Sequence, residues 1–186
     1  MTRFDQVLRR GFWSMLAAFS CACGEEVSGA LPSPDGQQFV LEVYPLLLRD
    51  CAYSGCHGQE QRFFQVYGPG RVRMPAAQMH DAERAELDYT DPVSPEEVQR
   101  AYERALSMLA SAAQVEDSLL LRKPLEPQAG GQGHKGVDAL GRDVFASKRD
   151  RGWRLLLAWA KSEGKPPTAE QVGALNAAVE ANQEQP

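Results

Sequence analysis

Two cysteines and a histidine lie within seven residues of one another, and they constrain the fold more than any other feature of the chain. Cys51 and Cys56 are separated by four residues, and His57 follows the second cysteine directly. A gap of this length does not place both sulfurs on one helical turn, so the backbone between them must bulge. Ser54 and Gly55 lie in the gap, and both residue types allow such a bulge.

Three chemical uses of this motif are open. Two cysteines followed by a histidine can hold a haem, through two thioether bonds and an imidazole on the iron, although the usual attachment signature has two residues between the cysteines. Two nearby cysteines can instead form a disulfide in an oxidising compartment, but a disulfide does not need His57. A zinc site would need two further ligands. We therefore favour haem, with a Cys51–Cys56 disulfide as the first alternative and another metal as the second.

The first residues of the chain resemble an export signal. Three arginines precede a short apolar run at residues 12–19, and small residues with two cysteines follow. A cysteine at the cleavage point resembles a bacterial lipoprotein signal, in which that cysteine is acylated. We therefore expect a signal over residues 1–22, with Cys21 or Cys23 as the lipidated residue. A simple cleaved signal is the alternative.

The following residues suggest a domain held near a membrane. Residues 23–36 are mostly small or acidic and contain proline and glycine, as expected for a flexible tether before a folded domain at residues 37–186. We expect a periplasmic protein or an outer-membrane-anchored lipoprotein. The pI near 5.3 argues against nucleic acid as a partner, and no apolar run is long enough for a transmembrane helix in the mature protein.

Hydrophobic spacing predicts a mostly α domain with long loops. Pro45 should kink or restart the first helix, and Ser94 with Glu97 should form a capping box at the start of the second. A short strand is expected at residues 63–67 and a short helix at residues 81–87. The longer expected helices cover residues 37–50, 95–113, 151–163 and 168–182.

The residues around the cysteine motif resemble the start of small bacterial cytochrome c-like domains. Those domains often open with a hydrophobic residue, a proline and a leucine-rich run before the two cysteines, and His-Gly follows the second cysteine. Residues 44–50 and 56–58 have this pattern. Residues 118–125, the glycine-rich loop around His134 and residues 153–160 are similar to the planctomycete-type version, which has a Ser-Leu-Leu segment with Lys-Pro, a His-Gly-Gly loop and a final helix containing tryptophan.

This resemblance covers most of residues 40–165. The chain departs from the pattern in its wider cysteine spacing, in Lys135 where a glycine is expected, and in Ala160 in place of an isoleucine. The resemblance implies a class I cytochrome c architecture, in which an N-terminal helix ends at the haem motif and packs against a C-terminal helix. It also implies one covalent haem c on Cys51 and Cys56. The contact between the two helices should join Leu46 and Leu47 to Trp153, Leu156 and Leu157.

Two residues are expected to bind the iron. His57 is the proximal ligand by its position, and the class I arrangement implies a distal ligand from a loop before the last core helix, where His134 lies. Met79 is the second candidate for the distal position, followed by Met74, His80 or an open site. Two imidazoles would give a lower reduction potential than a histidine and a methionine.

Other side chains have weaker expectations. Arg122 and Lys123 could pair with the haem propionates or be ordinary solvated charges. Met108 should fill the core, and Trp153 and Trp159 should pack in the interior, one of them against the ring edge.

The function expected from these residues is electron transfer between redox partner proteins at the bacterial envelope, with the haem carrying the electron. We do not expect an enzyme, although an open sixth site would permit ligand sensing or peroxide chemistry. The alternative is a non-redox helical surface lipoprotein, a binding or structural module with a Cys51–Cys56 disulfide.

Overall fold

A computed structural model of the chain describes residues 33–79, 87–134 and 143–183. Helices account for most of the regular structure in these ranges, which hold no named strand and one isolated bridge between Leu125 and Phe145. The predicted mostly α class is therefore confirmed. None of the described helices is long and apolar enough to cross a membrane. The helical elements are α1 (Gly36–Gln38), η1 (Phe39–Val43), α2 (Tyr44–Asp50), η2 (Ala76–Gln78), α3 (Pro95–Leu109), η3 (Val115–Asp117), α4 (Leu119–Arg122), η4 (Pro127–Ala129), α5 (Arg151–Ala160) and α6 (Ala169–Gln183).

The N-terminal helical segment α1–η1–α2 changes its winding just before Pro45. The Tyr44 N–H bonds to the carbonyl of Phe39, five residues back, so η1 is a π-helical stretch. Pro45 has no N–H to donate and lies at the start of α2, where the regular α-helix begins again. The expected restart of this helix therefore lies at Tyr44.

The predicted capping box at the start of α3 is confirmed. The Glu97 N–H donates to Ser94 Oγ at 3.2 Å, and the Ser94 N–H donates to Glu97 Oε2 at 3.0 Å. The expected length of this helix is wrong, because α3 ends at Leu109 and Ala113 is an exposed residue beyond it. The chain turns there, and Ser111 Oγ accepts the N–H of Leu119 at 2.9 Å.

The strand expected at residues 63–67 is absent. It pairs with no strand in the part of the chain that the structure describes, and its backbone bonds instead to the cysteine motif: the Val66 N–H donates to the His57 carbonyl at 3.0 Å. Phe63 is 58 % exposed, whereas Val66 is fully buried, so the weak alternation of the segment reflects a loop folded against the protein. The helix expected at residues 81–87 falls almost entirely outside the described residues.

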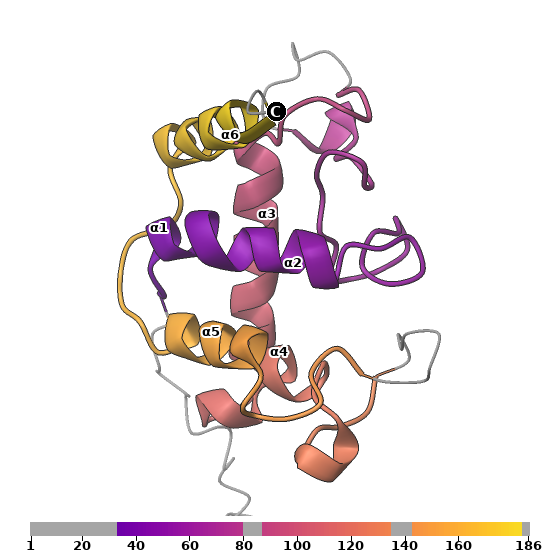
Figure 1. The fold of residues 1–186 in the computed structure, drawn as a ribbon, viewed down its shortest axis with the longest axis vertical. Helices are drawn as coiled ribbons and strands as arrows, with labels where there is room; N and C mark the ends of the chain where they lie inside the picture. The colour runs from indigo at the N-terminus through magenta and orange to yellow at the C-terminus, as the bar shows by residue number, and fades with distance from the viewer. Residues whose placement is uncertain (1–32, 80–86, 135–142, 184–186) are drawn as a thin grey trace, which may run out of the picture. The chain divides into compact units, whose positions relative to one another are not determined.

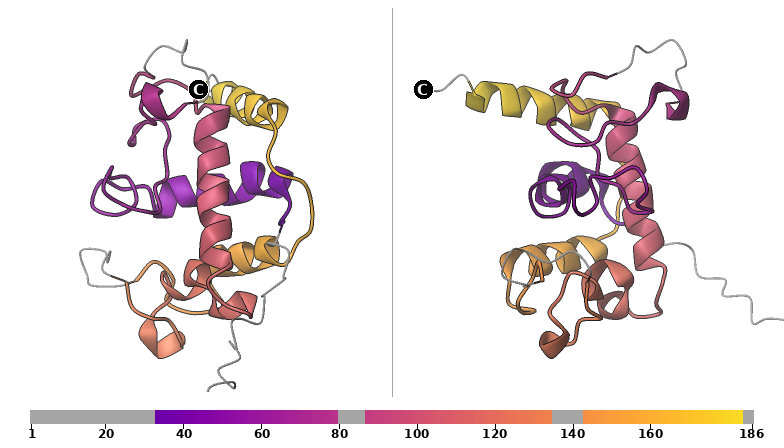
Figure 2. Two further views of the ribbon diagram at one scale, coloured as in Figure 1. Left: turned by 180° about the vertical axis from the view of Figure 1, so that it is seen from behind. Right: turned by 90° about the vertical axis from the view of Figure 1, so that its right-hand side faces the viewer.

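The core forms where α3 and α5 meet the N-terminal helical segment. Figures 1 and 2 show α3 crossing this segment steeply and α5 lying beside it. The buried ring of Phe39 lies 5.2 Å from that of Tyr102 on α3 and 5.1 Å from that of Trp159 on α5. Leu46 also approaches the start of α5, since a Cβ added to Gly152 would lie 3.2 Å from Leu46 Cδ1. The N-terminal helical segment thus packs against α5, as expected, but its aromatic contacts centre on Phe39 and Trp159.

Residues 33–36, which were assigned to the tether, are bonded to the segment after α5. Ser33 Oγ donates to the Gly164 carbonyl at 2.8 Å, and the Gly36 N–H donates to the Lys165 carbonyl at 2.8 Å. Trp159 Nε1 donates to the carbonyl of Asp35 at 3.0 Å. The beginning of the N-terminal segment is therefore fixed to the end of α5.

A buried ion pair joins the long loop after the cysteine motif to α3. Glu97 is fully buried and accepts two hydrogen bonds from the guanidinium of Arg73, at 2.9 and 3.0 Å. The backbone N–H groups of Met74 and Ser94 donate to the same carboxylate. The other donors of Arg73 bond to the carbonyls of Asp88, Asp91 and Pro92, so this guanidinium is saturated.

Replacing Glu97 should destabilise the protein strongly. In Glu97→Gln the Arg73 charge stays buried without its counter-charge, and we expect the free energy of unfolding to fall by about 3–5 kcal/mol, measured by urea denaturation. The matched control is Glu103→Gln, because Glu103 forms a partly exposed pair with Arg100 at 3.8 Å. That change should cost less than about 1 kcal/mol. Equal effects of the two substitutions would show that the buried pair does not hold the loop to α3.

Candidate functional site

The four-residue gap between the cysteines forms a closed turn at the end of α2. The Cys56 N–H donates to the Tyr53 carbonyl at 2.8 Å, and the His57 N–H donates to the Cys51 carbonyl at 3.0 Å. The turn ends at Gly58, where only glycine fits because a Cβ would lie 2.3 Å from the carbonyl oxygen of Ala52. The bulge keeps both cysteines, which are free thiols, beside the end of α2.

A cavity of about 370 Å³ joins the cysteine motif to the glycine-rich loop. Its volume falls within the usual range for small-molecule and cofactor sites. Most of its lining is aliphatic or aromatic, and charged side chains reach it at a few points. The lining residues are Leu47, Asp50, Cys51, Cys56, His57, Arg62, Phe63, Phe64, Met108, Leu119, Leu120, Lys123, Pro124, His134, Val144 and Leu156. The residues predicted to bind haem, Cys51, Cys56, His57 and His134, therefore share one cavity.

The backbone fixes the protonation and orientation of His57. Its Nδ1 lies 2.6 Å from the carbonyl oxygen of Phe64. A carbonyl can only accept a hydrogen bond, so the proton is on Nδ1 and Nε2 keeps a lone pair. The Phe64 ring packs edge-on against the imidazole, with 4.9 Å between centroids. A histidine that donates one ring N–H to a carbonyl and leaves the other nitrogen bare has the arrangement usual for a metal ligand.

Burial keeps the His57 imidazole neutral. Desolvation lowers the pKa of His57, and the nearby His134 and Arg62 lower it further, against the opposing effect of the Phe64 hydrogen bond. The neutral form is the one that binds a metal.

His134 lies beside His57 at the cavity. The two ring centroids are 5.6 Å apart, and the ring planes are inclined by 40°. Metal–nitrogen bonds are about 2 Å long, so two imidazoles on opposite sides of one metal need their centres roughly 6 Å apart. The observed separation is close to that value although the two residues are distant in the sequence.

The loop before His134 is held by close backbone contacts. The Gly131 N–H donates to the Glu126 carbonyl at 3.0 Å, and the Gln132 N–H donates to the Arg122 carbonyl at 2.9 Å. A Cβ on Gly131 would lie 1.7 Å from the carbonyl oxygen of Leu125, so only glycine fits there. This glycine lets the loop pass closely against the Leu125 backbone, three residues before His134, which lines the cavity.

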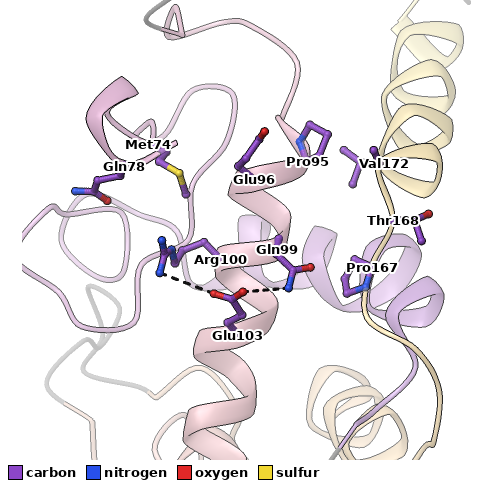
Figure 3. A pocket seen from close by; sticks show the side chains of 11 residues that line it. Met74, Gln78, Pro95, Glu96, Gln99, Arg100, Glu103, Pro167, Thr168 and Val172 are labelled. Carbon is purple, nitrogen blue, oxygen red and sulfur yellow. Dashed lines mark hydrogen bonds and ion pairs between the residues drawn. The ribbon is translucent and has the colours of Figure 1, made fainter. Parts of the chain in front are cut away.

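The methionine candidates for the distal position lie elsewhere. Met79 and Met74 belong to a separate buried cluster with Tyr67, and neither lines the cavity that contains His57. Met74 instead borders a smaller cavity of about 190 Å³ between α3 and the start of α6 (Figure 3). Polar side chains of that cavity bond to one another: Glu103 accepts from Gln99 at 3.1 Å and pairs with Arg100. His80, a further candidate, lies outside the described residues.

The charged residues at the cavity agree only partly with the expectations. Lys123 lines the cavity, whereas Arg122 does not and donates through Nε to the Gly130 carbonyl at 3.3 Å. Arg62 and Phe63 line the cavity and were not identified from the sequence; their position just after the cysteine motif was the available signal. Arg104 of α3 lies 4.4 Å from the centre of the Phe63 ring and supports this exposed side chain.

Of the large side chains expected in the core, Met108 lies at the cavity and the two tryptophans do not. Met108, expected to fill the core, lines the cavity wall. Trp153 and Trp159 are buried inside the protein, as expected, but neither lines the cavity, where one of them was expected at the ring edge. Trp153 Nε1 donates to the Leu121 carbonyl at 3.2 Å and so joins α5 to α4.

The Cys51 thiol is protonated in this environment. Burial raises the pKa of Cys51 to about 12, with smaller contributions from the charges of Asp50 and Cys56. A thiol of this kind has a very small thiolate fraction at neutral pH and is a poor nucleophile on its own.

The chemistry of the lining residues fits a haem. A porphyrin supplies four nitrogens to its iron and leaves up to two positions for protein ligands, and two imidazoles line this cavity. The two thiols lie in the same wall as His57, and the apolar lining suits a porphyrin face. In the described ranges, no three His, Cys, Asp or Glu side chains lie close enough together to hold a metal ion by themselves.

Comparison with known proteins does not assign the chain to a family: no protein-family model, curated protein or solved structure matches it.

Proposed function

We propose that the protein is a mono-haem c-type cytochrome that carries electrons. Cys51 and Cys56 would form the two thioether bonds, His57 would be the proximal iron ligand and His134 the distal ligand. The observation that supports this most strongly is the pair of imidazoles, with ring centroids 5.6 Å apart, that line one largely apolar cavity together with both thiols.

Bound haem would supply a one-electron iron couple, and the protein would set its potential and its accessibility. The Phe64 carbonyl orients His57 and increases the basicity of its Nε2. The leucine and phenylalanine side chains of the lining exclude water, while Lys123 and Arg62 can offset negative charge on the cofactor. Two imidazole ligands favour a lower potential than a histidine–methionine pair.

The proposed place of action is the bacterial envelope. This part of the proposal is supported by the sequence alone, through the signal-like residues 1–22 and the candidate lipidated residues Cys21 and Cys23. These residues lie outside the described part of the chain. Electron transfer requires close approach of a partner. Phe63, which lines the cavity and is 58 % exposed, marks the part of the site open to such a redox protein.

Covalent attachment can be tested directly. Protein produced together with a haem-attachment system should be red, and its Soret band should survive acid–acetone extraction. The Cys51→Ala/Cys56→Ala variant should release its haem under the same extraction because both thioether bonds are lost. A colourless protein whose mass shows only the loss of two hydrogens would instead support the alternative, a non-redox lipoprotein with a Cys51–Cys56 disulfide.

The distal ligand can be tested by spectroscopy. His134→Ala should convert a low-spin bis-imidazole spectrum into a high-spin one because the sixth position of the iron loses its nitrogen. Met79→Leu is the control, since Met79 lies in the separate buried cluster and should leave the spectrum unchanged. An unchanged low-spin spectrum in His134→Ala would exclude His134 as the ligand.

A glycine pair tests whether the loop positions His134. Gly131→Ala introduces a Cβ that collides with the Leu125 carbonyl, so we expect the loop to move and the low-spin fraction to fall. Gly55→Ala is the control because a Cβ at Gly55 meets nothing within 4 Å. The measurement is the low-spin absorbance of the two variants at equal haem content. A normal spectrum in Gly131→Ala would show that this contact does not determine the position of His134.

A further inference from the structure

The exposed side of α5 is basic in a protein that is acidic as a whole. The chain has a net charge of −5, but residues 148–165 contain six basic and two acidic side chains. All six basic residues are exposed to solvent, and together they are called the basic face of α5 below: Lys148, Arg149, Arg151, Arg154, Lys161 and Lys165.

Helical spacing places the central residues of this face on one side of α5. Arg151, Arg154 and Lys161 are spaced by three and seven residues, which returns to the same side of an α-helix. The other side carries the buried rings of Trp153 and Trp159. The helix is therefore amphipathic, with an apolar side in the core and an outer side whose charges are all positive.

Neighbouring carboxylates offset only part of this charge. Glu116 pairs with Lys161 at one end of the face. The part of the chain that the structure describes holds no ion pair between a carboxylate and Arg149, Arg151 or Arg154. These three guanidinium groups are exposed, so they are available to an external anionic surface.

The chain enters the folded domain beside the end of α5 (Figure 1). The Gly164 N–H donates to the Ser33 carbonyl at 2.8 Å, and the Asp35 N–H donates to Ser162 Oγ at 2.9 Å. A Cβ on Gly164 would lie 2.7 Å from the Cα of Asp35, so the two segments can lie this close only with glycine there. The point at which the preceding residues join the domain is therefore fixed next to the basic face.

The proposed acyl anchor limits how far α5 can lie from a membrane. About ten residues connect Cys23 to Ser33, and an extended chain of this length spans roughly 35 Å at most. The helix itself is about 15 Å long, because each residue of an α-helix adds 1.5 Å. An anchored chain therefore keeps the basic face within reach of the lipid headgroups.

We propose that the basic face of α5 binds the surface of a membrane that contains anionic phospholipids. Lysine and arginine are attracted to the negative surface potential of such a membrane within a Debye length, roughly 8 Å at physiological ionic strength. Guanidinium groups also bind phosphate through paired hydrogen bonds. An acyl chain together with a basic patch provides the two signals that stable membrane anchoring needs. This inference rests on the proposed location at the envelope and is independent of haem attachment.

Binding to vesicles tests this proposal. The full chain, produced without acylation, is sedimented with vesicles of phosphatidylcholine alone or of phosphatidylcholine with phosphatidylglycerol. Arg151→Gln/Arg154→Gln should weaken binding to the phosphatidylglycerol vesicles roughly tenfold or more, because two charges leave the basic face. The matched control, Arg100→Gln/Arg104→Gln, removes the same charge from α3 and should change the affinity less than about twofold.

Two outcomes of the sedimentation experiment would contradict the proposal. Equal losses in the two double variants would overturn the assignment of the basic face. Equal binding of the unsubstituted chain to both kinds of vesicle would overturn an anionic membrane as the occupant, in favour of an acidic protein. Neither readout depends on haem, so a failure here would leave the spectroscopic test of His134 unaffected.

Chemical labelling gives a second measurement that does not depend on the folding of a variant. Phenylglyoxal modifies accessible guanidinium groups, and mass spectrometry gives the rate at each arginine. In the unsubstituted full chain, Arg151 and Arg154 should react several-fold more slowly on phosphatidylglycerol vesicles than in solution, whereas Arg100 should keep its rate. Unchanged rates at Arg151 and Arg154 would show that this face does not contact the membrane.

Discussion

The packing of Phe39 between two helices positions everything around the cysteine motif. Its ring contacts Tyr102 of α3 and Trp159 of α5, and these three aromatic residues are almost completely inaccessible to solvent. Because η1 begins at Phe39 and continues directly into α2, this contact anchors the helical segment that leads to Cys51. The same arrangement lets Leu47 of α2, Leu120 of α4 and Leu156 of α5 share one cavity. The site thus depends on helix packing that lies outside it.

Much of the helical fold could be predicted, because its signals are local. Ser94 with Glu97 and the restart near Pro45 act within one or two turns of chain, and the structure follows them. The errors arose where long-range contacts decide. Residues 63–67 alternate weakly like a strand, but they fold against His57, and a strand needs a partner that the local sequence does not reveal. Ala113 has the right spacing for the α3 face, yet the chain has already turned.

Most residues of the candidate site could be identified from the sequence, but the contacts that position them could not. Adjacent Cys56 and His57 can be recognised from the sequence, and the hydrogen bond from Nδ1 to the Phe64 carbonyl cannot. Placing His134 at the cavity requires Gly131 to pass within contact of the Leu125 backbone. A glycine-rich loop indicates that such an approach is allowed, but the identity of the contact depends on the folded chain. Arg62 lies just after the cysteine motif in the sequence, but that position alone does not reveal that its side chain lines the cavity.

The width of the cysteine gap has a structural explanation in the turn it forms. In a two-residue gap, both sulfurs and the histidine lie along little more than one helical turn. Here the turn is closed by backbone hydrogen bonds from Cys56 and Gly58 to the Tyr53 carbonyl, and both sulfurs still line one cavity. Ala52, Tyr53 and Ser54 line a different space, where the guanidinium of Arg71 lies over the Tyr53 ring. A gap that weakens the motif as a sequence signature thus leaves both cysteines at the cavity with His57, while three of its four residues line a different space.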